Sequence, residues 1–144
     1  MRRISQHGLY LIKEFEGCNL HPYKDSAGFW TIGYGHLILP HENFDGGIAL
    51  QEAEELLRDD MASAVKSVCK LITRPLNDNQ YAALCSFTFN LGGGTLQRST
   101  LRKKCNRGDD DELPPEFMKY CYAGGRKISG LLRRRAAEAK LYML

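Results

Sequence analysis

Three side chains within the first forty residues have the types that acid–base catalysis needs: Glu16, Asp25 and Thr31. Glu16 is expected at the carboxyl end of a helix, where the helix dipole and the apolar Phe15 disfavour ionisation, as a general acid requires. Asp25 is expected in a polar turn beside Lys24, where it stays ionised. Two carboxyl groups in contrasting environments are typical of glycosidic chemistry. The spacing alone fits equally well a helix end, an ordinary turn and a strand threonine.

The elements that would position these residues follow from the hydrophobic periodicity. Apolar residues at helical spacing predict a helix over 4–15, capped by Ser5 and ending at Glu16 before a glycine. The segment 25–28 is a turn signal, and 29–32 has strong β-propensity. We therefore expect a β-hairpin or a three-stranded sheet over about 19–38.

From about residue 48 the pattern is helical to the end of the chain. An amphipathic stripe predicts one long helix over 49–68. Asn77 and Gln80 form a plausible capping box, and the run that follows is apolar nearly all round, as in a buried central helix. Shorter helices are expected from a cap at Ser99 or Thr100 to about 106, from Pro114 or Pro115 through Tyr122, and over 131–142. The predicted fold class is α+β, mostly helical.

The composition is that of an ordinary soluble globular protein. The 144 residues suffice for one compact domain or for a small lobe joined to a larger one. The net charge of +3 is too small to identify an anionic partner. The five cysteines are odd in number and lack zinc spacing, which favours reduced thiols. No segment has the length of a membrane span, and no apolar region follows the two N-terminal arginines.

The residues around the three candidates resemble the signature of the phage-type lysozymes, the bacteriophage endolysins of glycoside hydrolase family 24. That family has a Glu, eight residues, Asp, five residues, Thr arrangement, and Glu16, Asp25 and Thr31 fit it without insertion or deletion. The resemblance covers nearly the whole chain. It continues through 28–36 (GFWTIGYGH), 52–54, 75–77, 87–92 (FTFNLG), 98–101, 124–125 and 130–135 (GLLRRR).

The resemblance implies a lysozyme-like fold and a reaction. Residues 1–144 would form a single domain, with a small β lobe over about 17–48 joined by the long helix to a helical lobe of 1–16 and 69–144. The reaction would be inverting hydrolysis of the β-1,4 bond between N-acetylmuramic acid and N-acetylglucosamine in peptidoglycan. Glu16 would protonate the leaving oxygen, Asp25 would accept a proton from the attacking water, and Thr31 would hold that water.

The resemblance also implies supporting residues. It pairs His36 with Asp60 in a structural salt bridge, and no second His or Cys lies at metal spacing from His36. An arginine of the basic run 133–135 would reach the catalytic glutamate, and we assign this role to Arg133. A solvated helix face is the plain alternative for that run, and nucleic-acid binding has thinner support. Leu37, Phe89 and Thr100 match positions that line the family's saccharide cleft, although each also suits simple packing.

The expected partner is bacterial peptidoglycan, with no cofactor, no metal, no nucleic acid and no membrane span in this chain. We expect a monomer in the host cytoplasm that reaches the periplasm and wall after release. Related endolysins often carry an apolar N-terminal anchor, which is absent from this sequence, so either an anchor was trimmed away or a separate holin releases the enzyme. Many relatives also have a tryptophan before the Gly-Gly pair, where this chain has Tyr120-Cys121-Tyr122.

Two other functions remain open from the sequence. A lytic transglycosylase of similar shape would form an anhydro sugar and would need no pair of residues to activate water, so Asp25 with Thr31 argues against it. A non-enzymatic wall-binding or membrane-disrupting module would use the basic C-terminal helix, and the intact catalytic set argues against that.

Overall fold

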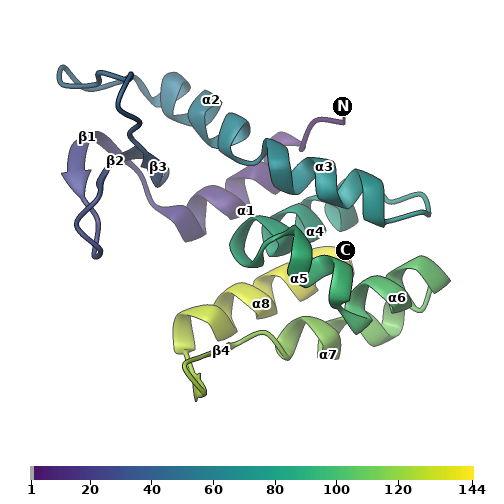
Figure 1. The fold of residues 1–144 in the computed structure, drawn as a ribbon. Coiled ribbons are helices and arrows are strands. Elements are labelled where there is room, and N and C mark those ends of the chain that lie inside the picture. The colour runs from purple at the N-terminus through teal and green to yellow at the C-terminus, as the bar shows by residue number, and fades with distance from the viewer. Residues whose placement is uncertain (1) are drawn as a thin grey trace. The chain divides into compact units, whose positions relative to one another are not determined.

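The structure is a computed structural model that describes residues 2–144. The chain divides into two compact units. The small unit is Tyr10–Ala62, and the large unit consists of the chain up to Leu9 together with Ser63–Leu144. The fold is α+β and mostly helical, as the sequence predicts (Figure 1).

The first helix ends at the candidate acid. Helix α1 (Gln6–Glu16) starts after Ser5, whose Oγ accepts a hydrogen bond from the Gly8 amide at 3.1 Å, so the predicted cap is confirmed. Gly17 follows with a φ of +66°, a left-handed conformation that glycine adopts without strain. The carboxyl group of Glu16 therefore lies at the end of a helix whose length the local sequence determines.

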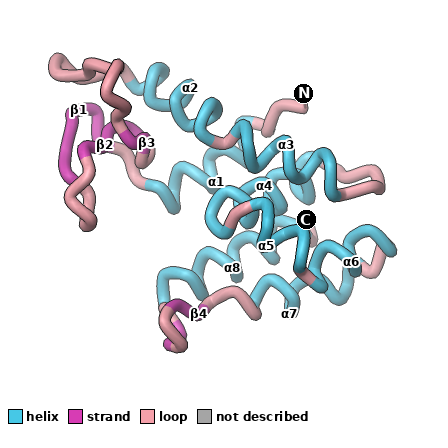
Figure 2. The backbone as a smooth tube through the Cα atoms, in the orientation of Figure 1, coloured by secondary structure: helices cyan, strands magenta, loops and turns pink. Residues whose placement is uncertain are grey.

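The small unit holds a three-stranded antiparallel sheet, drawn as magenta segments in Figure 2. Its strands are β1 (Asn19–Lys24), β2 (Trp30–Gly33) and β3 (His36–Leu37), in that order across the sheet. The predicted turn joins β1 to β2, and the sheet predicted over 19–38 is confirmed.

The single helix predicted over 49–68 is wrong in one respect, because the segment forms two helices. Helix α2 (Leu50–Asp60) ends at Met61, and α3 (Ala62–Leu71) begins directly after it. Met61 is buried, and its amide donates to the Leu57 carbonyl at 2.9 Å. The interruption involves neither glycine nor proline, so the amphipathic stripe continues across it and the sequence carries no sign of it.

The core of the large unit is built around helix α4 (Asp78–Leu91). The predicted capping box is present, since Asn77 Oδ1 accepts from the Gln80 amide at 2.8 Å. Every residue from 81 to 88 is buried, because α4 packs against α8 (Ser129–Tyr142), which also packs against α7 (Leu113–Met118). The central buried helix expected from the sequence is confirmed.

Shorter elements connect these helices. Ser99 caps α6 (Thr100–Arg107) by accepting a hydrogen bond from the Arg102 amide at 3.0 Å. The helix predicted through Tyr122 ends earlier, because Gly124 and Gly125 both have positive φ and form the turn of a short hairpin. The remaining elements are α5 (Gly93–Arg98), α6 (Thr100–Arg107), the 3₁₀ turn η1 (Asp110–Glu112), β4 (Tyr122–Ala123) and β5 (Arg126–Lys127).

The five cysteines are free thiols, three of them buried. No helix within residues 2–144 combines the length and the apolar character that crossing a bilayer requires.

Candidate active site

Asp25 occupies the turn between β1 and β2. Its Oδ1 accepts hydrogen bonds from the amides of Ala27 and Phe29, each at 2.9 Å, and its own amide donates to the Phe29 carbonyl at 2.9 Å. These bonds fix the carboxylate on an exposed turn. Within residues 2–144, the second oxygen, Oδ2, has no hydrogen-bond partner, so it is available to accept a proton or a hydrogen bond from water.

Thr31 is tied to the same turn. It is 4% exposed, and its Oγ donates to the Phe29 carbonyl at 2.9 Å. The Phe29 carbonyl thus accepts a hydrogen bond from the Thr31 hydroxyl, and the Phe29 amide donates one to Asp25 Oδ1. Because the hydroxyl proton is committed to Phe29, the Thr31 oxygen faces any further partner as an acceptor. The backbone amide and carbonyl of one residue, Phe29, therefore fix both acceptors.

The carboxyl group of Glu16 lies beside the tight turn between β2 and β3. A methyl group built on Gly35 would come within 3.9 Å of Glu16 Oε2, and Gly35 has a φ of +84°. Glu16 is half-buried. Gly35 in the TIGYGH motif therefore provides the left-handed backbone conformation with which the chain turns beside this carboxyl group.

His36 joins the sheet to α2 and to the loop that follows β3. Its Nδ1 lies 2.9 Å from Asp60 Oδ2, and its Nε2 lies 2.9 Å from Glu42 Oε1. Glu42 also accepts from the Leu39 amide at 2.8 Å. The contact expected between His36 and Asp60 is present, and Glu42 is a second carboxylate on the same imidazole that the sequence did not indicate.

These contacts change the acid–base properties of the cluster. Burial disfavours the charged imidazole, but the hydrogen bonds to Glu42 and Asp60 outweigh it, so the pKa of His36 is raised. The Leu39 amide and His36 lower the pKa of Glu42. Burial raises the pKa of Asp60, against the opposing effect of His36. Protonated His36 between two carboxylates is the form that stabilises the fold.

Replacing His36 with asparagine is expected to lower stability strongly near neutral pH and only slightly in alkali. Because the folded-state pKa is raised, the contribution is complete below about pH 6.5 and disappears as the pH rises through that raised value. The loss at pH 6 should be about 1.5–3 kcal/mol, the range for hydrogen bonds to charged groups. Urea unfolding at pH 6 and pH 9 measures it, and equal losses at both would contradict the ion pair.

Comparisons with known proteins identify the family of this chain. The family model described as phage lysozyme matches residues 13–138, which is most of the chain. The chain belongs to the phage lysozyme family. An endolysin of Acyrthosiphon pisum secondary endosymbiont phage 1 is 42% identical over 96% of this chain and 97% of its own length. That of Bacillus phage B103 is 39% identical over 97% of this chain, which spans 54% of that longer relative.

A solved structure of a variant of P22 lysozyme has the same fold. It superposes with a TM-score of 0.90 at 32% identity, covering the whole of both chains. The family and the fold that the sequence motifs indicated are therefore confirmed.

The positions assigned to the family's saccharide cleft lie in both units. Leu37, on β3 in the small unit, is 49% exposed. In the large unit, Phe89 is half-buried on α4, and Thr100 is the exposed first residue of α6. Each has surface that a ligand can contact, and their roles in binding stay predictions.

The basic run on α8 is only partly solvated. Arg133 is exposed, and its contact with the catalytic glutamate stays a prediction. A solvated face is wrong for Arg134 and Arg135, which are 6% and 0% exposed. Both contact Glu138, which is fully buried one turn further along the helix. The pattern of three adjacent arginines did not reveal this burial, although Glu138 at i+3 and i+4 was a usable signal.

Within the described part of the chain, no three His, Cys, Asp or Glu side chains gather as the ligands of a metal ion would. The groups at the site with defined chemistry are the carboxyl groups of Glu16 and Asp25 and the hydroxyl of Thr31.

Proposed function

We propose that this chain hydrolyses the β-1,4 bond between N-acetylmuramic acid and N-acetylglucosamine in bacterial peptidoglycan, with inversion at the anomeric carbon. Membership of the phage lysozyme family supports peptidoglycan hydrolysis. The observation that carries the mechanism is the hydrogen-bonded chain Asp25–Phe29–Thr31, because it leaves two acceptors for one water molecule.

The attacking water is positioned by the two hydrogen bonds that it donates. One hydrogen is donated to the Thr31 oxygen, whose own proton is committed to Phe29, and the other to the free oxygen of Asp25. With both hydrogens engaged, a lone pair of the water oxygen points to the anomeric carbon. Inversion requires room for this water, which corresponds to carboxyl groups about 6.5–9.5 Å apart.

Glu16 acts from the other face of the sugar as the general acid. Its proton passes to the glycosidic oxygen as the bond to the anomeric carbon breaks. The water oxygen forms the new bond, and its proton passes to Asp25. The products are a free hydroxyl on the leaving sugar and a hemiacetal with inverted configuration, and one proton must return from Asp25 to Glu16 through solvent.

The products test this proposal directly. Purified peptidoglycan is digested, and the new reducing ends are analysed by mass spectrometry and by ¹H NMR within the first minutes. We expect a reducing N-acetylmuramic acid end, formed by addition of water, that first appears as the α-anomer. A 1,6-anhydro end would instead identify a lytic transglycosylase, and an initial β-anomer would contradict the inverting role of Asp25.

The oligomeric state, the location and the route of release are part of the same proposal. The enzyme acts as a monomer on the bacterial cell wall, after a stage in the host cytoplasm that ends when a holin opens the inner membrane. Names of SAR-endolysins among its relatives support a link between this family and passage of the membrane.

A further inference from the structure

The sheet of the small unit has two faces with different chemistry. Thr31 lies opposite Tyr23 and Leu37, so these three side chains share one face. Trp30 lies opposite Lys24, and its carbonyl accepts from the Ile38 amide at 3.0 Å. Because neighbouring side chains in a strand alternate, Trp30 and Ile38 occupy the face opposite to the catalytic Thr31.

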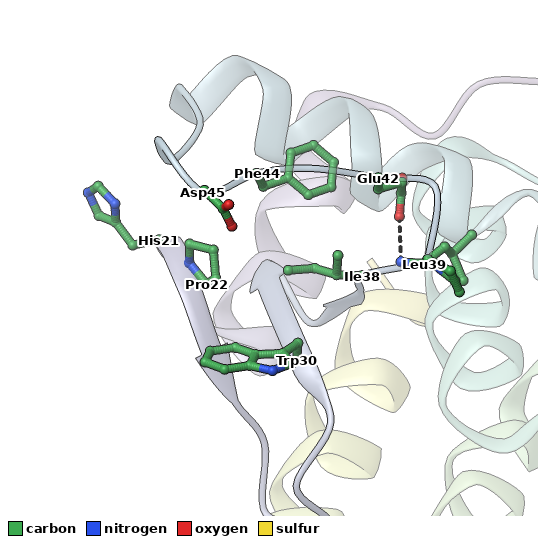
Figure 3. A pocket seen from close by; sticks show the side chains of 9 residues that line it. His21, Pro22, Trp30, Ile38, Leu39, Glu42, Phe44 and Asp45 are labelled. Carbon is green, nitrogen blue, oxygen red and sulfur yellow. Dashed lines mark hydrogen bonds between the residues drawn. The ribbon is translucent and has the colours of Figure 1, made fainter.

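This second face carries a cavity of about 730 Å³, which we call the aromatic cavity. Figure 3 shows Trp30 and Phe44 at opposite ends of its lining, with Pro22 and Ile38 between them. Trp30 is 53% exposed, although its ring is large and apolar. The volume is within the range of small-ligand sites, which are mostly apolar with a few polar groups.

The walls of the aromatic cavity are held in place. Glu42 bonds to the Leu39 amide and to His36, and the ring of Phe44 stands edge-on to His36 with centroids 6.1 Å apart. Gly47, which packs beside the His21 ring, has a φ of +82°, a left-handed conformation that favours glycine. The cavity is therefore preformed, which lowers the entropic cost of binding.

The polar groups limit what the aromatic cavity can bind. Glu42 is engaged by His36, whereas the exposed side chains of His21 and Asp45 add hydrogen-bonding groups to the lining. The Lys24 ammonium lies 5.4 Å from the indole centroid of Trp30. The exposed carboxylate of Asp45 disfavours anionic ligands on its side of the lining, such as the carboxylates of peptidoglycan stem peptides and acidic lipid headgroups.

We propose that the aromatic cavity is a second saccharide-binding site, which takes an N-acetylated hexosamine of the glycan strand. The apolar face of the sugar packs on Trp30, the acetyl methyl group lies against Pro22 and Ile38, and the hydroxyl groups bond to Asp45 and His21. The identity of the sugar rests on the proposed function. Such a site holds the enzyme on its polymeric substrate, because a second contact with the same polymer is intramolecular.

Trp30 is the only tryptophan in the chain, so its fluorescence reports on this cavity. The experiment uses the full chain with Glu16→Gln, which binds without cleaving, and titrates it with chitotetraose, a β-1,4 oligomer of N-acetylglucosamine. We expect a saturable change in Trp30 emission and reduced quenching by acrylamide.

Two exposed leucines provide a matched pair of variants in this background. Leu39 lines the aromatic cavity and is 42% exposed, whereas Leu37 lies on the opposite face and is 49% exposed. Leu39→Ala and Asp45→Ala should each weaken the Trp30 response, the latter about tenfold for a lost hydrogen bond to a charged group. Leu37→Ala should leave the midpoint unchanged. Both leucine variants replace exposed side chains, so folding is retained and is checked by thermal unfolding.

Each other result overturns the proposal. No Trp30 response would mean that chitotetraose does not bind in the aromatic cavity. A response that Leu37→Ala weakens as much as Leu39→Ala would place chitotetraose on the catalytic face instead. A response to free stem tetrapeptide or to vesicles of phosphatidylethanolamine and phosphatidylglycerol, without one to chitotetraose, would identify a peptide or a membrane instead. Because no hydrolysis is measured, a failed product analysis and a failed Trp30 titration are separate results.

Discussion

Replacing Glu16 with glutamine is expected to slow lysis of bacterial walls by about 10²–10⁴-fold, the usual contribution of a positioned proton donor. Glutamine has nearly the same shape at the end of α1, but it has no acidic proton to give to the glycosidic oxygen. The loss should appear in kcat, because the proton is transferred only in the transition state. Turbidity clearing of permeabilised Gram-negative cells measures the rate for the parent and the variant.

Asp25→Asn is the companion variant, because it separates the charge of the carboxylate from its structural bonds. The amide oxygen of asparagine can still accept from Ala27 and Phe29, so the turn should persist. Its other atom becomes an NH₂ donor, which cannot take a proton from water. We expect Asp25→Asn to lose activity with unchanged thermal unfolding.

For the Glu16→Gln variant, clearing of the cell suspension at the parent's rate would favour membrane disruption over catalysis.

Local sequence was sufficient to predict the elements around this site. Ser5, the turn at Asp25 and the capping residue Asn77 each act within four residues of where they stand, and the structure contains all three features. Hydrophobic periodicity likewise identified α4 as the buried helix. These features depend on interactions between near neighbours in the chain, which the sequence displays directly.

Features that depend on distant packing were missed. The interruption of the long helix at Met61 has no breaking residue, and the stripe of apolar residues continues across it. Glu42 gave no signal, because its partner His36 is reached only when the loop after β3 folds back. The catalytic assignment itself came from a family motif, since the spacing of Glu16, Asp25 and Thr31 alone has an ordinary structural explanation.

The buried charges of the large unit were also not predicted, and they give the largest expected effect on stability. Glu138 Oε2 accepts from Ser86 Oγ at 2.5 Å and lies 3.3 Å from Arg134 Nε. Its other oxygen lies 2.7 Å from Arg135 Nε, and Arg135 also donates to Asn90 at 2.8 Å. Burial raises the pKa of Glu138, and the guanidinium groups of Arg135 and Arg134 oppose that shift. The Glu138 carboxyl group thus contacts two buried arginines.

Glu138→Leu should therefore destabilise the chain by about 3–5 kcal/mol, the cost of leaving buried charge without its partner. Leucine fills much of the same space, so the loss reports on charge rather than on a cavity. Urea unfolding followed by circular dichroism gives the free energy, provided that the slope with urea is unchanged.

Glu138→Gln distinguishes charge from hydrogen bonding in the same position. Glutamine can still accept hydrogen bonds from Ser86 and from one arginine, but it carries no charge. The loss of unfolding free energy for Glu138→Gln should therefore be smaller than that for Glu138→Leu. Similar losses for both variants would mean that charge compensation dominates. A loss below about 1 kcal/mol for Glu138→Leu would contradict the argument, because Arg134 and Arg135 would then reach water or other partners at little cost.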